Sequence, residues 1–352
     1  MRPFINWAKP LGKDSVLVFY KCPEVLQGID DVKSFTSGTV STGNLDELVR
    51  ILKRSGVDYI VSDDYAPRVE LLMKLSRRLN LRKGVYVQLL YGMHALMRSY
   101  SKGTVNFKSE LTFSLIPLIP FRLLSKRYRD LLKDCDTLMA NSHFTASILC
   151  YLYGLEVRGV LYPPVDEMIF RPYLSNGTVK EVVLYCGSNA GDTDPALLKQ
   201  LLELLVNSNC IDKINLLGNK AVYSLMGEFV SHSKVNLIES VSDMELAAVY
   251  SKSILTISPQ EWETFGYVPV ESMLCGTPVL AFASQPSSEL VERKETARLV
   301  YSRKAFIEAI ERMLGNINAI HLMKQRCLQR REDLLSNLSC GLSADKLLSL
   351  LT

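Results

Sequence analysis

Short runs of β-branched and aromatic residues alternate with amphipathic segments along the chain. In the N-terminal half these runs predict strands at Val16–Tyr20, Val57–Ser62, Val85–Leu90, Thr137–Ala140 and Gly159–Tyr162. The intervening segments repeat apolar residues every three or four positions and predict helices at Leu45–Lys53, Arg68–Leu79 and Ser142–Tyr153. This alternation indicates an α/β fold with parallel sheets. The pattern leaves the start of the chain open, because Pro3–Trp7 could form the first strand instead.

A break rich in turn-forming residues separates two such series. It begins at Pro163-Pro164 and extends to Ser175-Asn176-Gly177-Thr178, a composition typical of an interdomain linker. Beyond it the pattern predicts strands at Val182–Cys186, Ile214–Leu217, Val235–Ile238, Ile254–Ser258 and Val279–Ala283, with helices at Pro195–Val206, Asp243–Ser251 and Tyr267–Leu274. We therefore expect two doubly wound domains, 1–172 and 173–334, facing each other across a ligand-binding cleft. The helical tail, about 335–352, is expected to pack back on the first domain.

Composition mainly excludes certain classes of protein and of site. The 352 residues suffice for two domains, and the eight cysteines show no spacing typical of a metal or redox site. No apolar run reaches the ~18 residues that a membrane-spanning helix needs. Because no secretory signal is visible at Met1–Lys13, we expect a cytoplasmic protein. We expect no metal and no cofactor, since no carboxylate cluster resembles a metal-diphosphate site.

The distribution of charge suggests a partner. Residues 68–133 hold 14 basic residues and three acidic ones, which predicts a strongly positive surface. Within this region, 107–133 combines apolar residues with Lys126, Arg127 and Arg129, a pattern typical of peripheral contact with an anionic membrane. A core or interdomain helix with a charged outer face is the equal alternative. Nucleic acid is not expected, because no DNA- or RNA-binding motif accompanies the charge.

The most informative segment is Ile257–Val279, which predicts a strand, a loop, a short helix and another strand. The loop carries Glu263, and Phe265-Gly266 precede a helix that carries Glu271. A helix N-terminus presents backbone N–H groups that attract anions such as phosphate, and glycine lets a ligand approach the backbone closely.

The spacing Glu263-x7-Glu271, with Phe265 and Gly266 inside it, resembles the signature of retaining family-4 glycosyltransferases (glycosyl transferases group 1). Three further stretches are similar to the family in the same order: the strand end Ala140-Asn141-Ser142, the linker from Leu161 to Pro172, and Cys275-Gly276-Thr277-Pro278-Val279. The resemblance covers roughly residues 135–280. It implies the GT-B architecture, in which two Rossmann-like domains bind acceptor (N-terminal) and donor (C-terminal).

The resemblance also implies roles for individual residues. Glu263 would contact the donor sugar and help to stabilise the transition state, Phe265 and Gly266 would offer backbone N–H groups, and Glu271 would bind the ribose. His94 resembles the histidine of the N-terminal domain that contacts the donor sugar, although a structural role is equally open. Gly12 would stand for the glycine loop near the diphosphate. The implied reaction transfers a hexose with retention from a nucleotide sugar to a lipid-linked or growing glycan acceptor.

One departure from the family pattern concerns the diphosphate. After its first C-terminal strand the family has an arginine and a lysine, where this chain has Gly187-Ser188 and then Asp194. Ser188 thus replaces one cation, and Asp194 lies where the lysine is expected; Lys220, or Lys9 and Lys13, could substitute. Two alternatives stay open: a weakly active or non-catalytic relative that binds glycan or membrane, and another GT-B enzyme such as a sugar-nucleotide epimerase or a phosphorylase.

Overall fold

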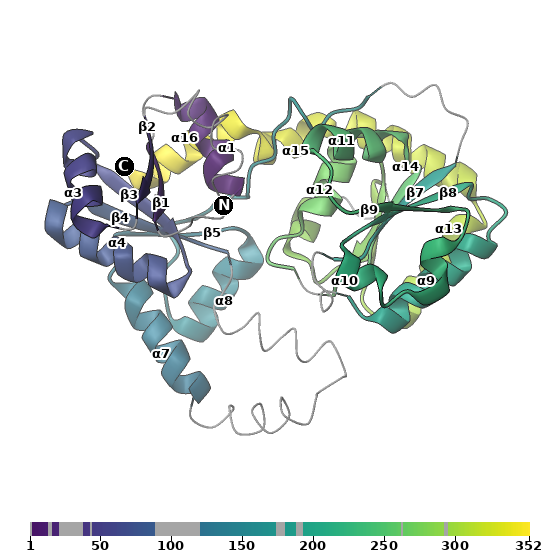
Figure 1. Cartoon of the computed structure of the whole chain (residues 1–352), viewed down its shortest axis with the longest axis horizontal. Coiled ribbons are helices and arrows are strands. Elements are labelled where there is room, and N and C mark those ends of the chain that lie inside the picture. Colours follow the sequence, from purple (N-terminus) through teal and green to yellow (C-terminus); the bar gives the residue numbers. More distant parts are fainter. Residues whose placement is uncertain are drawn as a thin grey trace. The chain divides into compact units, whose positions relative to one another are not determined.

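A computed structural model describes residues 2–12, 16–20, 38–42, 44–88, 120–173, 180–187, 193–261, 263–291 and 295–352. These residues form two compact units (Figure 1). Unit 1 contains the described residues up to Asp166 together with Asn337–Thr352, and unit 2 contains Glu167–Ser336. Each unit alternates strands and helices around parallel sheets, which confirms the predicted α/β class.

Unit 1 contains a parallel pair, β1 and β2, and a four-stranded parallel sheet in the order β3-β4-β5-β6. The strands are β1 (Val16–Tyr20), β2 (Gly38–Thr42), β3 (Tyr59–Asp63), β4 (Arg82–Val87), β5 (Thr137–Ala140) and β6 (Gly159–Val160). The helices are α1 (Arg2–Leu11), α3 (Leu45–Arg54), α4 (Ala66–Leu79), α7 (Pro120–Lys133), α8 (His143–Tyr153) and α16 (Cys340–Leu351).

Successive residues of β4 point to opposite faces of the four-stranded sheet, as the two-residue period of a strand requires. Val85 and Val87 pack in one apolar cluster with residues of α4, α7 and α8. Tyr86 packs in another cluster with Trp7 of α1 and Leu347 of α16. The sheet of unit 1 is therefore covered on both faces, and the last helix of the chain forms part of one cover.

The first residues form a helix, so the interpretation of Pro3–Trp7 as a strand is wrong. Helix α1 repeats apolar residues at Phe4, Trp7, Ala8 and Leu11, the spacing of one helical face. Trp7 is buried, and its Nε1 donates a hydrogen bond to Ser343 Oγ of α16 at 2.7 Å. A segment more than 300 residues away thus packs against the apolar face of α1.

Unit 2 contains a six-stranded parallel sheet in the order β12-β11-β10-β7-β8-β9. Its strands are β7 (Glu181–Tyr185), β8 (Lys213–Leu217), β9 (Val235–Ile238), β10 (Leu255–Ser258), β11 (Val279–Phe282) and β12 (Ala297–Val300). Its helices are α9 (Pro195–Asn207), α10 (Lys220–Tyr223), α11 (Asp243–Lys252), α12 (Tyr267–Leu274), α13 (Arg303–Leu314), α14 (Ile317–Gln329) and α15 (Arg331–Leu338), with short 3-10 turns η3 (Gly227–Ser231) and η4 (Pro286–Leu290).

Helices cover both faces of this sheet, with α9 and α13 on one face and α11 and α12 on the other (Figure 1). The chain leaves β7 toward β8 and leaves β10 toward β11, so the strand order reverses between β7 and β10. In open parallel sheets, ligands bind outside the carboxyl ends of the strands at such a reversal. The fold of unit 2 therefore directs attention to the loops that follow β7 and β10.

Candidate functional site

The loop after β10 leads into α12 through a glycine that the geometry requires. Gly266 is the N-cap of α12 and has a φ of +89°, in the left-handed region that favours glycine. A Cβ at this position would lie 2.8 Å from both Gln285 Oε1 and Ser287 Oγ. Because glycine has no side chain, the first N–H groups of α12 are not capped by their own N-cap residue. This arrangement leaves a helix N-terminus suited to an anion or to sugar hydroxyls.

The predicted site residues of this segment differ in exposure. Glu263 is half-buried in the loop, and Phe265, just before α12, is 2% exposed. Glu271, within α12, is 1% exposed. The carbonyl of Phe265 accepts a hydrogen bond from the Ser287 backbone N–H at 2.8 Å, which ties the loop to η4. Glu263 and Glu271 therefore belong to one loop-helix unit beside the reversal of strand order.

Buried amide side chains fix this loop to its neighbours. Gln260 Nε2 donates to Tyr185 O at 3.0 Å, at the end of β7, and to Thr193 Oγ1 at 2.8 Å. Gln285 Nε2 donates to Gln260 O at 2.9 Å, from the segment that follows β11. Both glutamines are at most 1% exposed, and buried hydrogen-bonded polar side chains specify a single arrangement. The loop that carries Glu263 is thus held from two sides.

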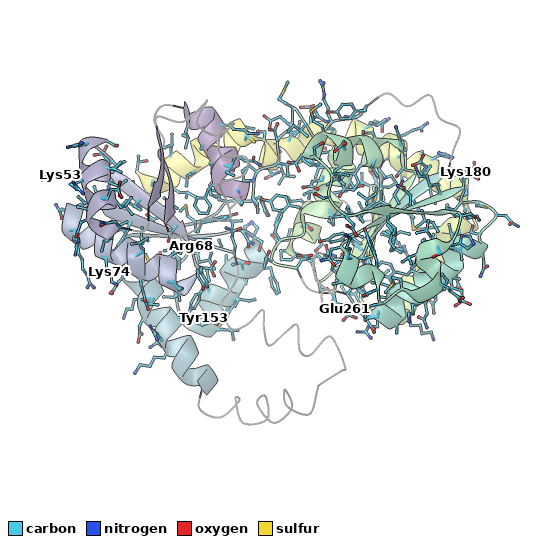
Figure 2. The ribbon with its side chains drawn as sticks, in the orientation of Figure 1. Lys53, Arg68, Lys74, Tyr153, Lys180 and Glu261 are labelled. Atoms are coloured by element: carbon cyan, nitrogen blue, oxygen red, sulfur yellow. The ribbon has the colours of Figure 1, made fainter. Side chains whose placement is uncertain are left out.

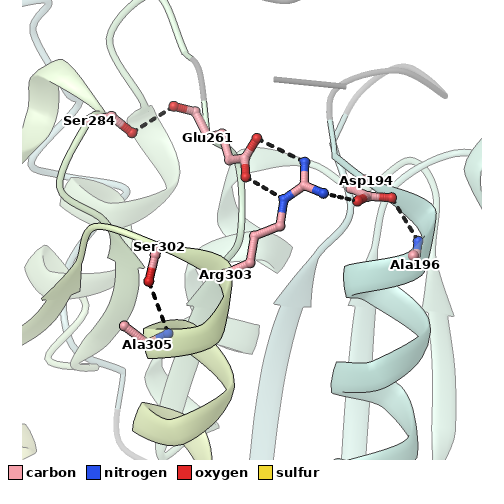
Figure 3. A network of polar contacts seen from close by, with 7 residues as sticks. All are labelled: Asp194, Ala196, Glu261, Ser284, Ser302, Arg303 and Ala305. Carbon is pink, nitrogen blue, oxygen red and sulfur yellow. Dashed lines mark hydrogen bonds and ion pairs between the residues drawn. The ribbon is translucent and has the colours of Figure 1, made fainter. Parts of the chain in front are cut away.

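An ion-pair network connects the same region to α13 (Figure 3). Arg303 contacts Glu261 with two nitrogens, Nε to Oε1 at 2.6 Å and Nη2 to Oε2 at 3.1 Å, and its Nη1 contacts Asp194. Hydrogen bonding to Glu261 raises the pKa of Arg303 above its ordinary value, so the guanidinium stays charged. Asp194 also accepts a hydrogen bond from Ala196 N at 2.9 Å as the N-cap of α9.

Arg303 is the residue that sequence reasoning missed. Its partners lie 109 and 42 residues away, so no local pattern links them. The only sequence signal is its place directly after a strand and a Ser302 N-cap, where loop residues meet the carboxyl edge of a sheet. The position where the resemblance expects a lysine is thus an aspartate that binds an arginine, and two carboxylates share the charge of that arginine.

The structure also locates the glycines and lysines that were predicted to lie near the diphosphate. Gly187 follows β7 with a φ of +93°, at the expected strand end. Lys220 begins α10 with its side chain 89% exposed and 4.0 Å from Glu239 Oε2. Gly12 ends the first helix of unit 1 with a φ of +55°, and Lys9 pairs with Asp166 in the same unit. His94, Ser188 and Lys13 lie outside the described residues.

The structure therefore brings Phe265, Gly266, Glu263 and Glu271 together at the reversal between β7 and β10, with Gly187 ending the adjacent strand. Lys220 lies at the end of β8 on the same edge and points into solvent. Among the described residues, no group of three or more acidic, histidine or cysteine side chains is placed to hold a metal ion.

Comparison with known proteins supports this picture. Residues 212–327 match the family model described as "Glycosyl transferases group 1". No curated protein matches the sequence.

Solved structures show the same fold at low sequence identity. The chain is similar to Anabaena HepE in complex with UDP-glucose, with a TM-score of 0.74, 12% identity, and coverage of 99% of this chain and 94% of that chain. It is similar to a glycosyltransferase from Rickettsia africae, with a TM-score of 0.69, 15% identity, and coverage of 99% and 93%. It is also similar to WaaG, a glycosyltransferase involved in lipopolysaccharide biosynthesis, with a TM-score of 0.67, 14% identity, and coverage of 100% and 95%. The chain is a glycosyltransferase of the GT-B fold, and its C-terminal unit carries the domain of the glycosyl transferases group 1.

Proposed function

We propose that this glycosyltransferase moves a hexose, with retention of configuration, from a nucleoside diphosphate sugar to a lipid-linked or growing glycan acceptor. The observation that carries the proposal is the N-terminus of α12, whose N-cap Gly266 provides no side-chain cap, beside the reversal of strand order. An N-terminus of this kind carries a partial positive charge of about +0.5 and suits a diphosphate. The crystal structure of HepE with UDP-glucose, a protein similar in fold, supports uridine as the first base to test.

Each residue of the loop-helix unit has a separate role in this proposal. The backbone N–H groups of Phe265 and Gly266 bind sugar hydroxyls or phosphate, and the half-buried Glu263 bonds the sugar and stabilises positive charge that develops at its anomeric carbon. The buried Glu271 accepts hydrogen bonds from the ribose hydroxyls. In a front-face route the leaving phosphate takes the proton of the acceptor hydroxyl, so no protein nucleophile is needed. Retention rests on the family resemblance alone.

Charge sets the strength of donor binding in this proposal. Arg303 shares its charge with Asp194 and Glu261, and Lys220 extends into solvent. Of the described groups at this edge, the N–H groups of α12 then supply the main positive potential. One charge-assisted hydrogen bond contributes ~1.5–3 kcal/mol, so we expect weaker donor binding than in a relative with both cations.

The pairing of Arg303 with two carboxylates favours one second candidate function. A site in which carboxylates neutralise the nearest arginine would suit a weakly active or non-catalytic protein that binds glycan. Glu263 and Glu271, both placed on the loop-helix unit, support the enzyme instead. A sugar-nucleotide epimerase is distinguished by its products, because it forms no glycoside and releases no nucleoside diphosphate.

Thermal unfolding in the presence of UDP, GDP and ADP tests the donor site. A nucleotide at 100 times its Kd stabilises the folded protein by ~2.7 kcal/mol, and this shift should vanish in Glu271→Gln. Glu308→Gln on the exposed side of α13 is the matched control and should keep the shift. If no nucleotide stabilises the protein, the donor proposal is wrong and the binding protein is favoured. A shift that EDTA abolishes would contradict the expectation that no metal takes part.

The location of the acceptor is a separate proposal. None of the described helices combines the length and hydropathy needed to cross a bilayer. We propose that the protein acts at the cytoplasmic face of an anionic membrane, where a lipid-linked acceptor would lie. Exposed Lys126 and Lys133 on α7 support this, because they place positive charge on the surface of unit 1. The neighbouring Arg127 and Arg129 are also exposed but pair with Glu70 and Asp130.

A further inference from the structure

Helix α8 differs from the other long helices of unit 1 because it contains no acidic or basic residue apart from His143. Its ends are well defined: Ser142 Oγ accepts a hydrogen bond from Thr145 N at 3.1 Å, and Gly154 closes the helix with a φ of +62°. A surface helix of a globular protein usually carries charge on its outer face. The absence of charge on α8 therefore has to be explained by what its outer face meets.

The inner face of α8 packs on the sheet of unit 1. Thr145, Leu149 and Tyr153 (labelled in Figure 2) are buried. The centres of the Tyr153 ring and the Tyr128 ring on α7 lie 5.5 Å apart. These residues recur at the spacing of a helical face, so they fix the rotation of α8 about its axis.

The outer face of α8 exposes large apolar side chains. Phe144 is 37% exposed, Tyr151 is 85% exposed and Leu152 is 62% exposed. Residues 144, 148, 151 and 152 fall on one stripe of the helix, with the partly exposed Ile148 between the two ends. Single exposed apolar residues are ordinary, but a contiguous stripe marks a surface that meets a partner or a membrane.

The neighbours of this stripe are cationic. Helix α7 packs against both α8 and α4, so the three helices form one continuous layer. Helices α4 and α7 together contain nine basic residues and two acidic ones. On α4, Lys74 lies on the exposed side (Figure 2), and on α7 Lys126 and Lys133 are exposed. Four of the nine basic residues pair with carboxylates, and the others leave α4 and α7 with an excess of positive charge. An uncharged apolar stripe thus lies beside a positively charged layer.

We propose that the outer stripe of α8 inserts into the interfacial region of an anionic bilayer, while the cations of α7 and α4 contact the lipid phosphates. This inference rests on the proposed peripheral location and names the element that makes the contact. Aromatic and aliphatic side chains suit the boundary between headgroups and acyl chains, and cations near the surface add electrostatic attraction.

Charge decides between a bilayer and a second copy of the chain as occupant. In a symmetric dimer through α8, the cationic helices α7 and α4 of two copies would approach each other and repel. An anionic lipid surface instead complements them. The membrane is therefore the occupant that both features favour.

Sedimentation of the full chain with phosphatidylcholine vesicles, with and without phosphatidylglycerol, tests the proposal. Tyr151→Ser/Leu152→Ser should lower the affinity for the anionic vesicles by about tenfold, because apolar surface that would be buried in lipid is lost. Tyr301→Ser/Leu322→Ser is the matched control, since these residues are 73% and 56% exposed in unit 2. This control pair should bind vesicles like the unaltered protein.

A second measurement reports insertion directly. Tyr151→Trp should show fluorescence that brominated lipids quench beyond the background of Trp7 and Trp262. Lys126→Gln/Lys133→Gln should weaken binding only to vesicles that contain phosphatidylglycerol.

Three results would overturn the inference. The first is unchanged vesicle affinity of Tyr151→Ser/Leu152→Ser; if Lys126→Gln/Lys133→Gln still weakens binding, the peripheral location survives and only insertion of α8 is wrong. The second is no binding of the unaltered protein to either vesicle, which refutes the peripheral location as well. The third is a dimer in ultracentrifugation that Tyr151→Ser/Leu152→Ser dissociates. None of these measurements requires donor binding, so the nucleotide experiment stands or fails separately.

Discussion

The two units use the carboxyl ends of their parallel strands in different ways. In unit 1, Asp63 pairs with Arg68 only five residues further on, and Asp64 accepts hydrogen bonds from Gln88 N and Tyr128 Oη, at 2.9 and 2.8 Å. In unit 2, side chains join loops that follow four different strands.

The links of unit 2 involve two glutamines and one arginine. Gln260 connects the loops after β10 and β7, Gln285 connects those after β11 and β10, and Arg303 connects the end of β12 to both β7 and β10. A substitution of Arg303 in unit 2 should therefore disturb several loops at once, whereas one of Arg68 in unit 1 should act on the loop after β3. Two parallel sheets of similar architecture can therefore hold the loops at their carboxyl ends differently. In unit 2, long-range polar side chains join these loops to one another, whereas in unit 1 Asp63 binds a residue of the helix that follows it directly.

The largest expected effect is a difference between substitutions of two glycines with a positive φ, Gly266 in unit 2 and Gly154 in unit 1. Gly266→Ala should destabilise unit 2 by ~2–4 kcal/mol and abolish transfer, because the new methyl group would lie 2.8 Å from Gln285 Oε1 and Ser287 Oγ. Gly154→Ala in unit 1 has a similar positive φ but meets nothing within 4 Å, so it should cost only ~1 kcal/mol. Denaturant unfolding and a glycoside assay measure both. Equal costs for the two variants would contradict the close packing at Gly266.

The next effect tests the hydrogen bond that joins α1 to α16 in unit 1. Ser343→Ala leaves the buried Trp7 Nε1 without its acceptor and should cost ~1–3 kcal/mol. Ser349→Ala on the same helix removes an exposed hydroxyl that donates to Lys346 O, and it should change stability by less than ~0.5 kcal/mol. Hydrogen exchange should show the loss in α1 and α16, with unit 2 unchanged. A loss spread over unit 2 would contradict independent unfolding of the two units.

A smaller effect compares two arginines of similar exposure. Arg303→Gln should cost about 1–2 kcal/mol and speed hydrogen exchange in the loops after both β7 and β10, because its two carboxylate partners lose their cation. Arg68→Gln removes a single partner of Asp63 and should cost less than ~1 kcal/mol, with a local change in exchange. Confinement of the Arg303→Gln effect to one loop would refute the view that this residue connects several.

The smallest effect is a pH dependence of unit 2. Burial lowers the pKa of Lys324 to about 8, although its Nζ donates to Ser251 O at 2.8 Å. Since the unfolded lysine has a pKa of 10.5, the unfolded state binds more protons above pH 8, and stability should rise there. Burial raises the pKa of Cys275 and Cys327 from 9.0 to about 12, so the stability that these two thiols contribute to the folded state falls above pH 9.

The rise in stability due to Lys324 is therefore expected between pH 8 and pH 9. The expected gain across it is ~0.5–1 kcal/mol, reduced because the side chain is only partly buried. Urea unfolding at both pH values measures it, with Lys324→Met as the comparison. A gain of the same size in Lys324→Met would assign the rise to another group.

Most strands were predictable from sequence because their cores are β-branched runs, such as Val182–Cys186. The short strand Ala297–Val300 was not, since Arg298 interrupts its apolar pattern. The loop-helix unit of Glu263 and Glu271 was also predictable, because glycine, proline and the two carboxylates stand within one short segment. The partners of α1 and of Arg303 were not, because they lie far along the chain.

The contact between α1 and α16 also bears on how the protein is made. The ribosome releases α1 early, but α16 emerges only after all of unit 2 has been synthesised. Until then Trp7 and Tyr86 lack one of the helices that bury them, so one face of the unit 1 sheet stays only partly covered during translation. Unit 2, which is continuous over Glu167–Ser336, can complete its core first. The N-terminal unit is thus the last to finish folding.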